Sequence, residues 1–365
     1  MPPQIGGHQH TGTMDTQISK LVSDHPFGQG TSREEAMATQ RRRGNEAGRG
    51  RLAKAPWQIP LTGWMDIFWR TYTQFNEDRV LAVSAGVVFY GLLALFPAVT
   101  ALVSLYGLIA ERSLINQQMA FISDLLPSGT YQVVQDQVSL VLSKGGDSLG
   151  LAFLFSLCFS LWSANSGTKA VIDALNIVYE EKEKRGFFVF NLVCLAFTFT
   201  ALAFVILALL GVVAFPIVLE RVGMGAYSRL LIQVARWPTL VAIMLVSLAL
   251  LYRYGPSRRE SRWEWLSVGS VLAVLAWLGG SAMLSWYLSR FADYSATYGS
   301  LGAAIGLMLW MWISTTVILL GAELNAEIEH QTTQDTTIGP EKPLGARGAT
   351  MADTVGKSSE QSLNS

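Results

Sequence analysis

Charged residues are scarce in this chain of 365 residues. Asp, Glu, Lys and Arg make up 15% of it, whereas about 25% is typical of globular domains. The 27 basic and 27 acidic side chains give a formal net charge of zero. A nucleic-acid-binding domain is normally basic, so we expect no nucleic-acid partner. The apolar residues are concentrated between two polar ends, which argues against an ordinary soluble enzyme.

Cysteine and histidine are equally sparse. The two cysteines, Cys158 and Cys194, are too few for a disulfide framework or a four-ligand metal site, and they are predicted to be buried apolar fillers. A metal-dependent hydrolase needs clustered histidine and carboxylate ligands. We therefore expect no metal site, no cofactor and no enzyme activity. The histidines all lie in or beside the polar ends, at His8, His10, His25 and His330.

The two polar ends, residues 1–56 and 331–365, show no apolar periodicity. Segments of this kind cannot bury enough apolar surface to offset the entropy lost on ordering. They are predicted to be disordered tails on either side of a membrane domain that covers residues 57–330.

Long apolar runs fill the middle of the chain. Each is close to or above the roughly 20 helical residues that a bilayer core requires. The runs are apolar on all sides, whereas the helices of a soluble core would keep a polar face. The sequence therefore predicts an all-α, polytopic integral membrane protein with six transmembrane helices. The runs are residues 80–110, 149–179, 187–218, 237–254, 263–288 and 300–323.

Two further segments are amphipathic. Residues 57–75 place Trp64, Phe68 and Tyr72 at helical spacing, which predicts an interfacial helix that leads into the first span. Residues 113–144 alternate apolar and polar side chains and predict one or two short helices on the outer surface between spans one and two. The alternative for both segments is a pair of helices packed on the protein surface.

Basic residues in two short loops indicate the orientation. Loops rich in Lys and Arg remain in the cytoplasm, and with six spans both termini then lie on that side. The loop after the second run carries Lys182, Lys184 and Arg185, and the loop after the fourth carries Arg253, Arg258, Arg259 and Arg262.

Six blocks of sequence stand out, at residues 82–97, 161–164, 173–176, 294–302, 310–312 and 320–327. Together these blocks resemble the YihY/BrkB family of bacterial inner-membrane proteins. The resemblance covers about residues 60–328 and implies a six-helix, multi-pass protein of the inner membrane with cytoplasmic termini. The family's name history includes ribonuclease BN and virulence factor, and transport or lipid movement has been suggested for it.

Polar residues form one stripe along the second run. Asn165, Lys169, Asp173 and Asn176 recur at intervals of four, four and three residues and so share one helix face. Charged groups at membrane depth usually face a cavity or a partner, which makes the stripe a candidate polar pathway. Alternatively, this part of the helix extends past the headgroups, where Lys169 and Asp173 form an ordinary exposed pair.

Glu323 and Asn325 close the last run on the same side as this stripe. They complete the candidate polar pathway, with a hypothetical ion pair between Glu323 and Lys169. Alternatively, the two residues cap the helix in the cytoplasmic interface.

Proline and small residues suggest how the helices pack. Pro97 lies deep in the first run, where a proline kinks a helix; it is a candidate hinge for alternating access, or it simply shapes the bundle. Ala82 with Gly86, and Gly302 with Gly306, have the four-residue spacing of helix-packing faces. Such a face packs helices within one subunit or, in the alternative, between copies in a homo-oligomer.

The preferred function is a translocator or exporter of a lipid or small amphiphile, with membrane lipids as its partners. The alternative is a non-transporting membrane scaffold or envelope-integrity factor. A membrane-associated ribonuclease is the least favoured function, because the apolar region offers no histidine and the chain has no net positive charge.

Overall fold

The protein is described from a computed structural model. The described residues are 38–40, 42–107, 135, 139, 151–209, 226–291 and 300–363. Within them every regular element is helical, and one isolated β-bridge joins Ser261 to Thr337. The prediction of an all-α fold is therefore confirmed for this part of the chain. The predicted outer-surface helices at 113–144 fall outside it, apart from residues 135 and 139.

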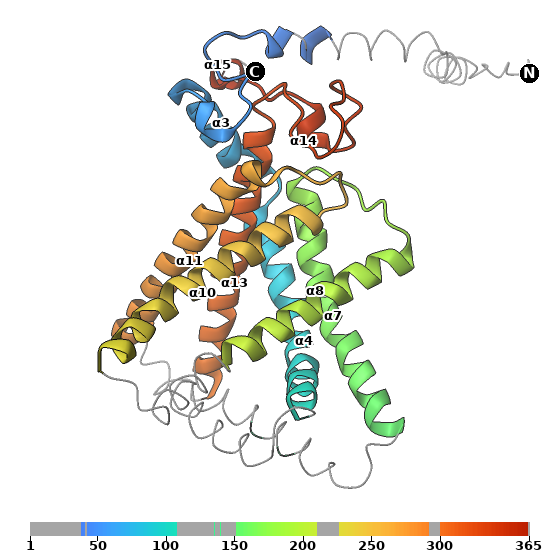
Figure 1. Cartoon of the computed structure of the whole chain (residues 1–365), viewed down its shortest axis with the longest axis vertical. Coiled ribbons are helices and arrows are strands. Elements are labelled where there is room, and N and C mark those ends of the chain that lie inside the picture. Colours follow the sequence, from blue (N-terminus) through green and yellow to red (C-terminus); the bar gives the residue numbers. More distant parts are fainter. Residues whose placement is uncertain are drawn as a thin grey trace, which may run out of the picture.

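Among the described residues, six long helices form the body of the molecule, and short ones gather at one end of it (Figure 1). In chain order the elements are η1 (Pro56–Gln58), α3 (Leu61–Glu77), α4 (Val80–Gly107), α7 (Leu151–Val178), α8 (Phe187–Leu209), α10 (Ala226–Tyr254), α11 (Trp263–Phe291), α13 (Ser300–Glu329), α14 (Thr350–Asp353) and α15 (Ser359–Leu363).

Three of these helices are long and apolar enough to cross a membrane, over Phe187–Ile206, Trp263–Leu288 and Ala304–Glu329. Helices α3 and α4 together also qualify, but a 56° bend separates them. The described residues thus support three spans, or four with the bent pair, rather than the six predicted. Helix α10 has only a shorter apolar stretch, Pro238–Tyr254, and α7 carries the polar stripe along its second half.

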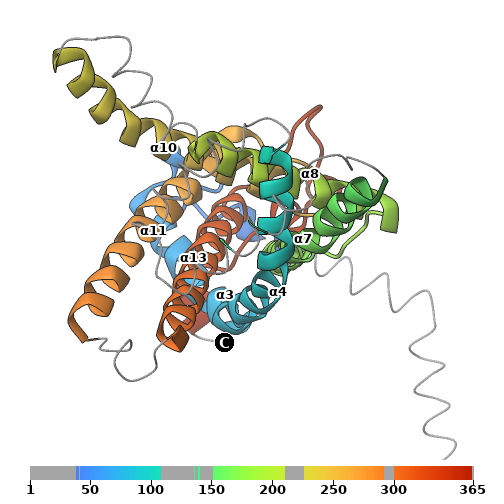
Figure 2. The same ribbon diagram turned by 90° about the horizontal axis from the view of Figure 1, so that it is seen from below.

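The long helices pack one against the next in a curved row whose two ends, α8 and α10, lie on the same side of the molecule (Figure 2). Seen from below, α13 lies between α11 and α4, with α7 and α8 beyond α4 (Figure 2). Helix α10 packs on α11 at the opposite end of the row. The main apolar core lies near the end that carries α14, where Leu175, Tyr252, Leu266 and Leu319 come together from four helices and Met351 covers them.

Helices α11 and α13 approach each other through two glycines. A Cβ atom added to Gly269 would overlap the carbonyl oxygen of Gly321, and one added to Gly321 would lie 2.6 Å from the carbonyl oxygen of Gly269. In lipid, close backbone approach of this kind is a main source of helix association. Gly269 and Gly321 thus allow the two backbones to lie in close contact.

The predicted packing faces lie elsewhere. Ala82 and Gly86 are exposed on α4, and a Cβ at Gly86 meets nothing within 4 Å. Gly302 lies near the start of α13, and a Cβ at Gly306 would make only an ordinary contact with Leu288 at 3.6 Å. Spacing alone identified small residues but not the face that the neighbouring helix uses. The two cysteines also differ, since Cys194 is buried and Cys158 is exposed.

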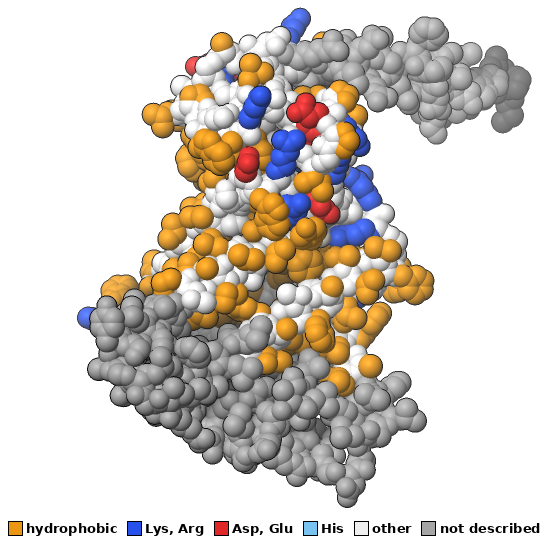
Figure 3. All heavy atoms as spheres, viewed as in Figure 1, with side chains coloured by type: hydrophobic (Ala, Val, Ile, Leu, Met, Phe, Trp, Pro, Cys, Tyr) orange, Lys and Arg blue, Asp and Glu red, His pale blue; other side chains and the backbone are white. Residues whose placement is uncertain are grey.

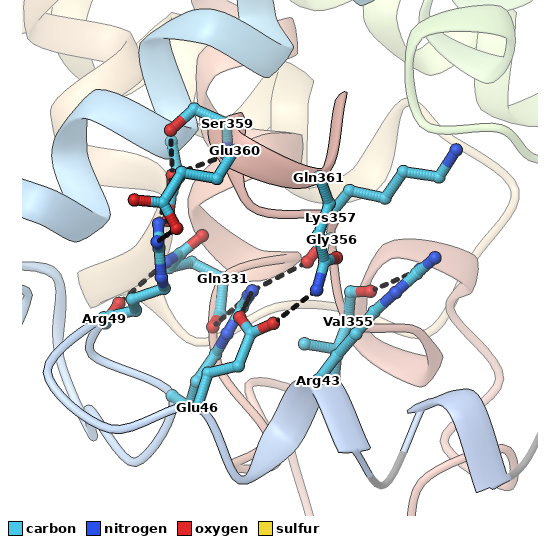
Figure 4. A network of polar contacts seen from close by, with 12 residues as sticks. Arg43, Glu46, Arg49, Gln331, Val355, Gly356, Lys357, Ser359, Glu360 and Gln361 are labelled. Carbon is cyan, nitrogen blue, oxygen red and sulfur yellow. Dashed lines mark hydrogen bonds and ion pairs between the residues drawn. The ribbon is translucent and has the colours of Figure 1, made fainter. Parts of the chain in front are cut away.

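The polar ends are packed rather than disordered over residues 42–60 and 331–363. Arg51 is 1% exposed and donates hydrogen bonds to the carbonyl oxygens of Gln331 (3.3 Å) and Gly356 (2.8 Å). Arg49 bonds Glu360 at 2.7 Å, in the network of Figure 4. Charged side chains bonded to backbone carbonyls hold these segments, so apolar periodicity gave no sign of their order. Residues 1–37, 41 and 364–365 lie outside the description.

The glycine contact gives a direct test of the packing. We expect Gly321→Ala to lower the free energy of unfolding by about 1–3 kcal/mol, because the added methyl group overpacks the α11–α13 contact. Thermal unfolding in detergent measures the change. Gly86→Ala is the matched control, since it adds the same methyl group where there is open space. Equal unfolding temperatures for the two variants would contradict the contact.

Candidate functional site

A cavity of about 1170 Å³ lies among α4, α7, α8 and α10, and Met311 and Thr315 of α13 also line it. Small residues make room for it, including Gly91 and Ala94 on α4 and Ala164 and Gly167 on α7. Most of the other lining side chains on these helices are apolar. Because α8 and α10 are the two ends of the helix row, the cavity lies where the row is not closed.

One end of the cavity is basic. Among the described residues that line the cavity, one is acidic, Glu260. The basic residues come from the two loops that the sequence singled out, together with the last turn of α10. They are Lys184, Arg185, Arg253, Arg258 and Arg259. Figure 3 shows Lys and Arg side chains over the upper part of the described surface and mainly hydrophobic side chains below them.

Three of these cations are neutralised by the protein itself. The Arg185 guanidinium bonds both carboxylate oxygens of Glu183 at 2.7 Å. Arg258 bonds Glu329 through two nitrogens at 2.9 Å each. Lys184 bonds Glu181 at 2.6 Å. The Arg258–Glu329 pair fixes the second loop against the end of α13, whereas the other two pairs lie within the first loop.

Arg253 is different because its guanidinium is buried without a matched acceptor. The residue is 8% exposed, and its Nε and Nη1 atoms have no hydrogen-bond partner. The Glu260 carboxylate lies 3.8 Å from Nη2, beyond normal hydrogen-bond length. The guanidinium carbon lies 4.4 Å from the centroid of the Trp263 ring. Arg259 also has a buried nitrogen, Nη1, without a partner.

The polar stripe of α7 does not line the cavity. Its neighbours Ala164, Gly167, Thr168 and Val171 do so from an adjacent helix face. The four stripe residues are separated by environment, since Asn165 and Asn176 are buried, Lys169 is half-buried and Asp173 is exposed. The stripe therefore contains two buried residues and two that reach the surface. A polar pathway through these four residues stays a prediction.

The buried members of the stripe bind neighbouring elements. The Asn165 Oδ1 atom accepts a bond from the Thr198 hydroxyl of α8 at 3.3 Å. Asn176 accepts from the Ser257 backbone N–H at 2.7 Å and donates to Glu183 at 3.1 Å. Asn176 thus ties α7 to both basic loops. Lys169 lies with its Nζ atom 5.0 Å from the centroid of the Trp162 ring.

The two polar residues of α13 also have separate environments. Asn325 is fully buried, accepts from the Gly269 N–H at 2.8 Å and donates to the Leu266 carbonyl at 3.3 Å, so it binds α13 to α11. Glu323 is fully buried, and neither carboxylate oxygen has a hydrogen-bond partner. The predicted Lys169–Glu323 ion pair is wrong.

Pro97 lies inside α4, and the helix continues past it to Gly107. The 56° bend lies instead between α3 and α4, where Arg79 adopts a positive φ of 50°. A hinge at Pro97 stays a prediction. The neighbouring residues Leu95 and Ala98 line the cavity.

A second polar cluster was missed in the sequence. Arg70 of α3 pairs with Glu327 of α13 and donates to Gln331 at 2.8 Å. The available signal was the position of Asp66 and Arg70 on the face of α3 opposite its aromatic residues. Both are buried, whereas Phe68 and Tyr72 are exposed. Within the described residues, no three His, Cys, Asp or Glu side chains are grouped to hold a metal ion.

Apolar spanning helices with a charged end define this protein as a helical membrane protein. Residues 71–345 match the family described as Virulence factor BrkB, and the chain belongs to that family.

Individual relatives support the membrane assignment. The ribonuclease-like protein YfkH of Bacillus subtilis is 29% identical over 259 residues, which cover 70% of this chain and 92% of that protein. A UPF0761 membrane protein of Alkalilimnicola ehrlichii is 27% identical over 68% of this chain and 55% of its own length. One of Rhodospirillum centenum is 25% identical, with 84% and 67% covered. No solved structure matches the chain significantly.

The loop pairing predicts a pH dependence. Burial alone would raise the pKa of Glu183, but hydrogen bonds from Arg185 and Asn176 lower it to about 2. The stabilisation is present above the ordinary pKa of about 4.3 and is lost as the pH falls toward 2. Glu183→Gln should lower the free energy of unfolding at pH 7 by about 1 kcal/mol, a value that allows for solvent screening. It should also reduce the loss of stability between pH 4 and pH 2. Unfolding at pH 7, 4 and 3 measures this, with the exposed Glu341→Gln as control; identical acid curves for Glu183→Gln and the unmodified protein would refute it.

Proposed function

We propose that this protein translocates a lipid or another small amphiphile across the bacterial inner membrane. The cavity is the observation that carries the proposal, because it combines apolar walls with a basic end. Small-molecule pockets typically enclose about 300–1,000 Å³, so a volume of about 1170 Å³ offers room for more than a compact solute. Apolar walls favour acyl chains, and the basic end favours a polar headgroup.

The position of the cavity supports access from the membrane. Helix α8, one of its walls, is apolar enough to span a bilayer. Ala196 and Ala201 line the cavity from α8 and are also exposed at the surface of the chain. An amphiphile in the bilayer could therefore reach the cavity beside α8 without first entering water.

The arrangement of the ends supports a cytoplasmic orientation of the basic end. Helix α3 turns Leu61, Phe68 and Tyr72 outward and its polar side inward, as an interfacial helix would require. Both basic loops, α3 and the described C-terminal segment lie at one end of the bundle (Figure 1). By the positive-inside rule we place that end, and both termini, in the cytoplasm. The proposal includes no enzyme activity and no nucleic-acid partner.

Reconstituted vesicles test translocation. A fluorescently labelled phospholipid in the inner leaflet is protected from a quencher added outside the vesicles. Vesicles that contain this protein should lose this protection faster than vesicles without it. Ala201→Trp should slow the loss about tenfold or more, because the indole would fill part of the cavity.

Leu192→Trp is the matched control on the same helix, since Leu192 is 67% exposed and does not line the cavity. Equal rates for vesicles with and without protein would contradict translocation. That result, combined with capture of a protein partner by the packed ends, would favour the scaffold function.

A further inference from the structure

The unmatched donors at the basic end of the cavity identify a specific ligand chemistry. Arginine side chains keep their charge in proteins, and burial of a charge is costly unless it is paired and hydrogen-bonded. Arg185 and Arg258 meet this requirement through Glu183 and Glu329. Arg253 does not, although it lies at the same end of the same cavity.

The surroundings of Arg253 supply no hydrogen-bond acceptor to its Nε and Nη1 atoms. Trp263 and Tyr254 have their ring centroids 4.4 and 5.4 Å from the guanidinium carbon, so aromatic contacts stabilise the cation without using its N–H groups. Glu260 lies 3.8 Å away and is partly exposed, with 38% of its side chain accessible. It balances the charge without completing the hydrogen bonds.

We propose that Arg253, assisted by Arg259, binds the phosphate group of an anionic phospholipid whose acyl chains occupy the apolar cavity. Guanidinium groups form strong charge-assisted hydrogen bonds with phosphate oxygens. This inference rests on the proposed function, since it names the substrate class of the same cavity. The headgroup carries a net negative charge, because the ammonium group of a zwitterionic lipid would be repelled by Arg253 and Arg259, the two cations at this end that lack a bonded carboxylate.

Glu260 provides a second test, because removing its charge should change lipid affinity in the opposite direction to removing the charge of Arg253. Its carboxylate competes with a lipid phosphate for Arg253 and repels it. Glu260→Gln should therefore tighten binding of an anionic lipid, whereas Arg253→Gln should weaken it. A purely structural ion pair predicts no gain for either variant.

Lipid binding to the purified full-length protein in detergent tests the inference. Phosphatidylglycerol, phosphatidylcholine, glycerol 3-phosphate and inorganic phosphate are added separately, and binding is followed by native mass spectrometry and thermal stabilisation. Phosphatidylglycerol should bind at least about tenfold more tightly than phosphatidylcholine. Arg253→Gln should weaken its binding about tenfold, Arg253→Lys less, and Glu260→Gln should strengthen it severalfold.

Arg262→Gln is the matched control, because Arg262 lies in the loop that follows α10, is exposed and does not line the cavity. Equal loss of binding in Arg262→Gln and Arg253→Gln would overturn the inference, as would equal affinity for the two lipids. Binding of inorganic phosphate as tight as that of phosphatidylglycerol would overturn the lipid assignment. If Arg253→Gln does not fold, the Glu260→Gln variant is sufficient for the test. An unchanged affinity of Glu260→Gln for phosphatidylglycerol would then overturn the inference.

The binding measurement is separate from translocation. Arg253-dependent binding without lipid movement would support the inference and contradict the proposed function. Translocation of both lipids at the same rate, with no dependence on Arg253, would support the proposed function and contradict the inference.

Discussion

Buried charges need partners, and this requirement organises one end of the molecule. The sides of the long helices are apolar and give little preference for one neighbour over another in lipid. Specific contacts are supplied instead at the helix ends, where Arg70 meets Glu327 and Arg258 meets Glu329. Residues before α3 and after α13 complete the same network through Arg51.

This fixed end has a consequence for the rest of the bundle. Asn176 joins α7 to the basic loops, and Asn325 joins α13 to α11 beside the close approach of Gly269 and Gly321. The helix row is therefore held firmly at its centre and its charged end. Helices α8 and α10, at the margins of the row, leave the cavity between them. Arg253, whose guanidinium has two buried nitrogens without acceptors, lies where the firm end meets this cavity.

The sequence predicted the helical class and the membrane character well, because long apolar runs without a polar face are stable in a bilayer only as helices. It did not predict the order of residues 331–363, since hydrogen bonds from Arg347 and Arg51 to backbone carbonyls have no periodic signal. It also chose Gly86 rather than Gly321 as a packing residue, because spacing does not reveal which face a neighbour covers. The two basic loops were recognised as an orientation signal, but their convergence on one cavity depends on tertiary packing.

The candidate site was anticipated only in part. Asn176 and Asn325 were singled out and have specific polar partners, but those partners are structural groups on adjacent elements. Arg253 was noticed only as one of several loop cations. Its distinguishing property is burial without matched acceptors, which a sequence cannot express because it depends on where Trp263 and Glu260 lie in space.

An experimental structure in a bilayer that contains anionic phospholipid tests the central claim most directly. The account predicts elongated lipid density between α8 and α10, with its phosphate against the Arg253 guanidinium and its acyl chains beside Gly91 and Gly167. A cavity closed by protein side chains, or a lipid whose headgroup points away from Arg253, would contradict it.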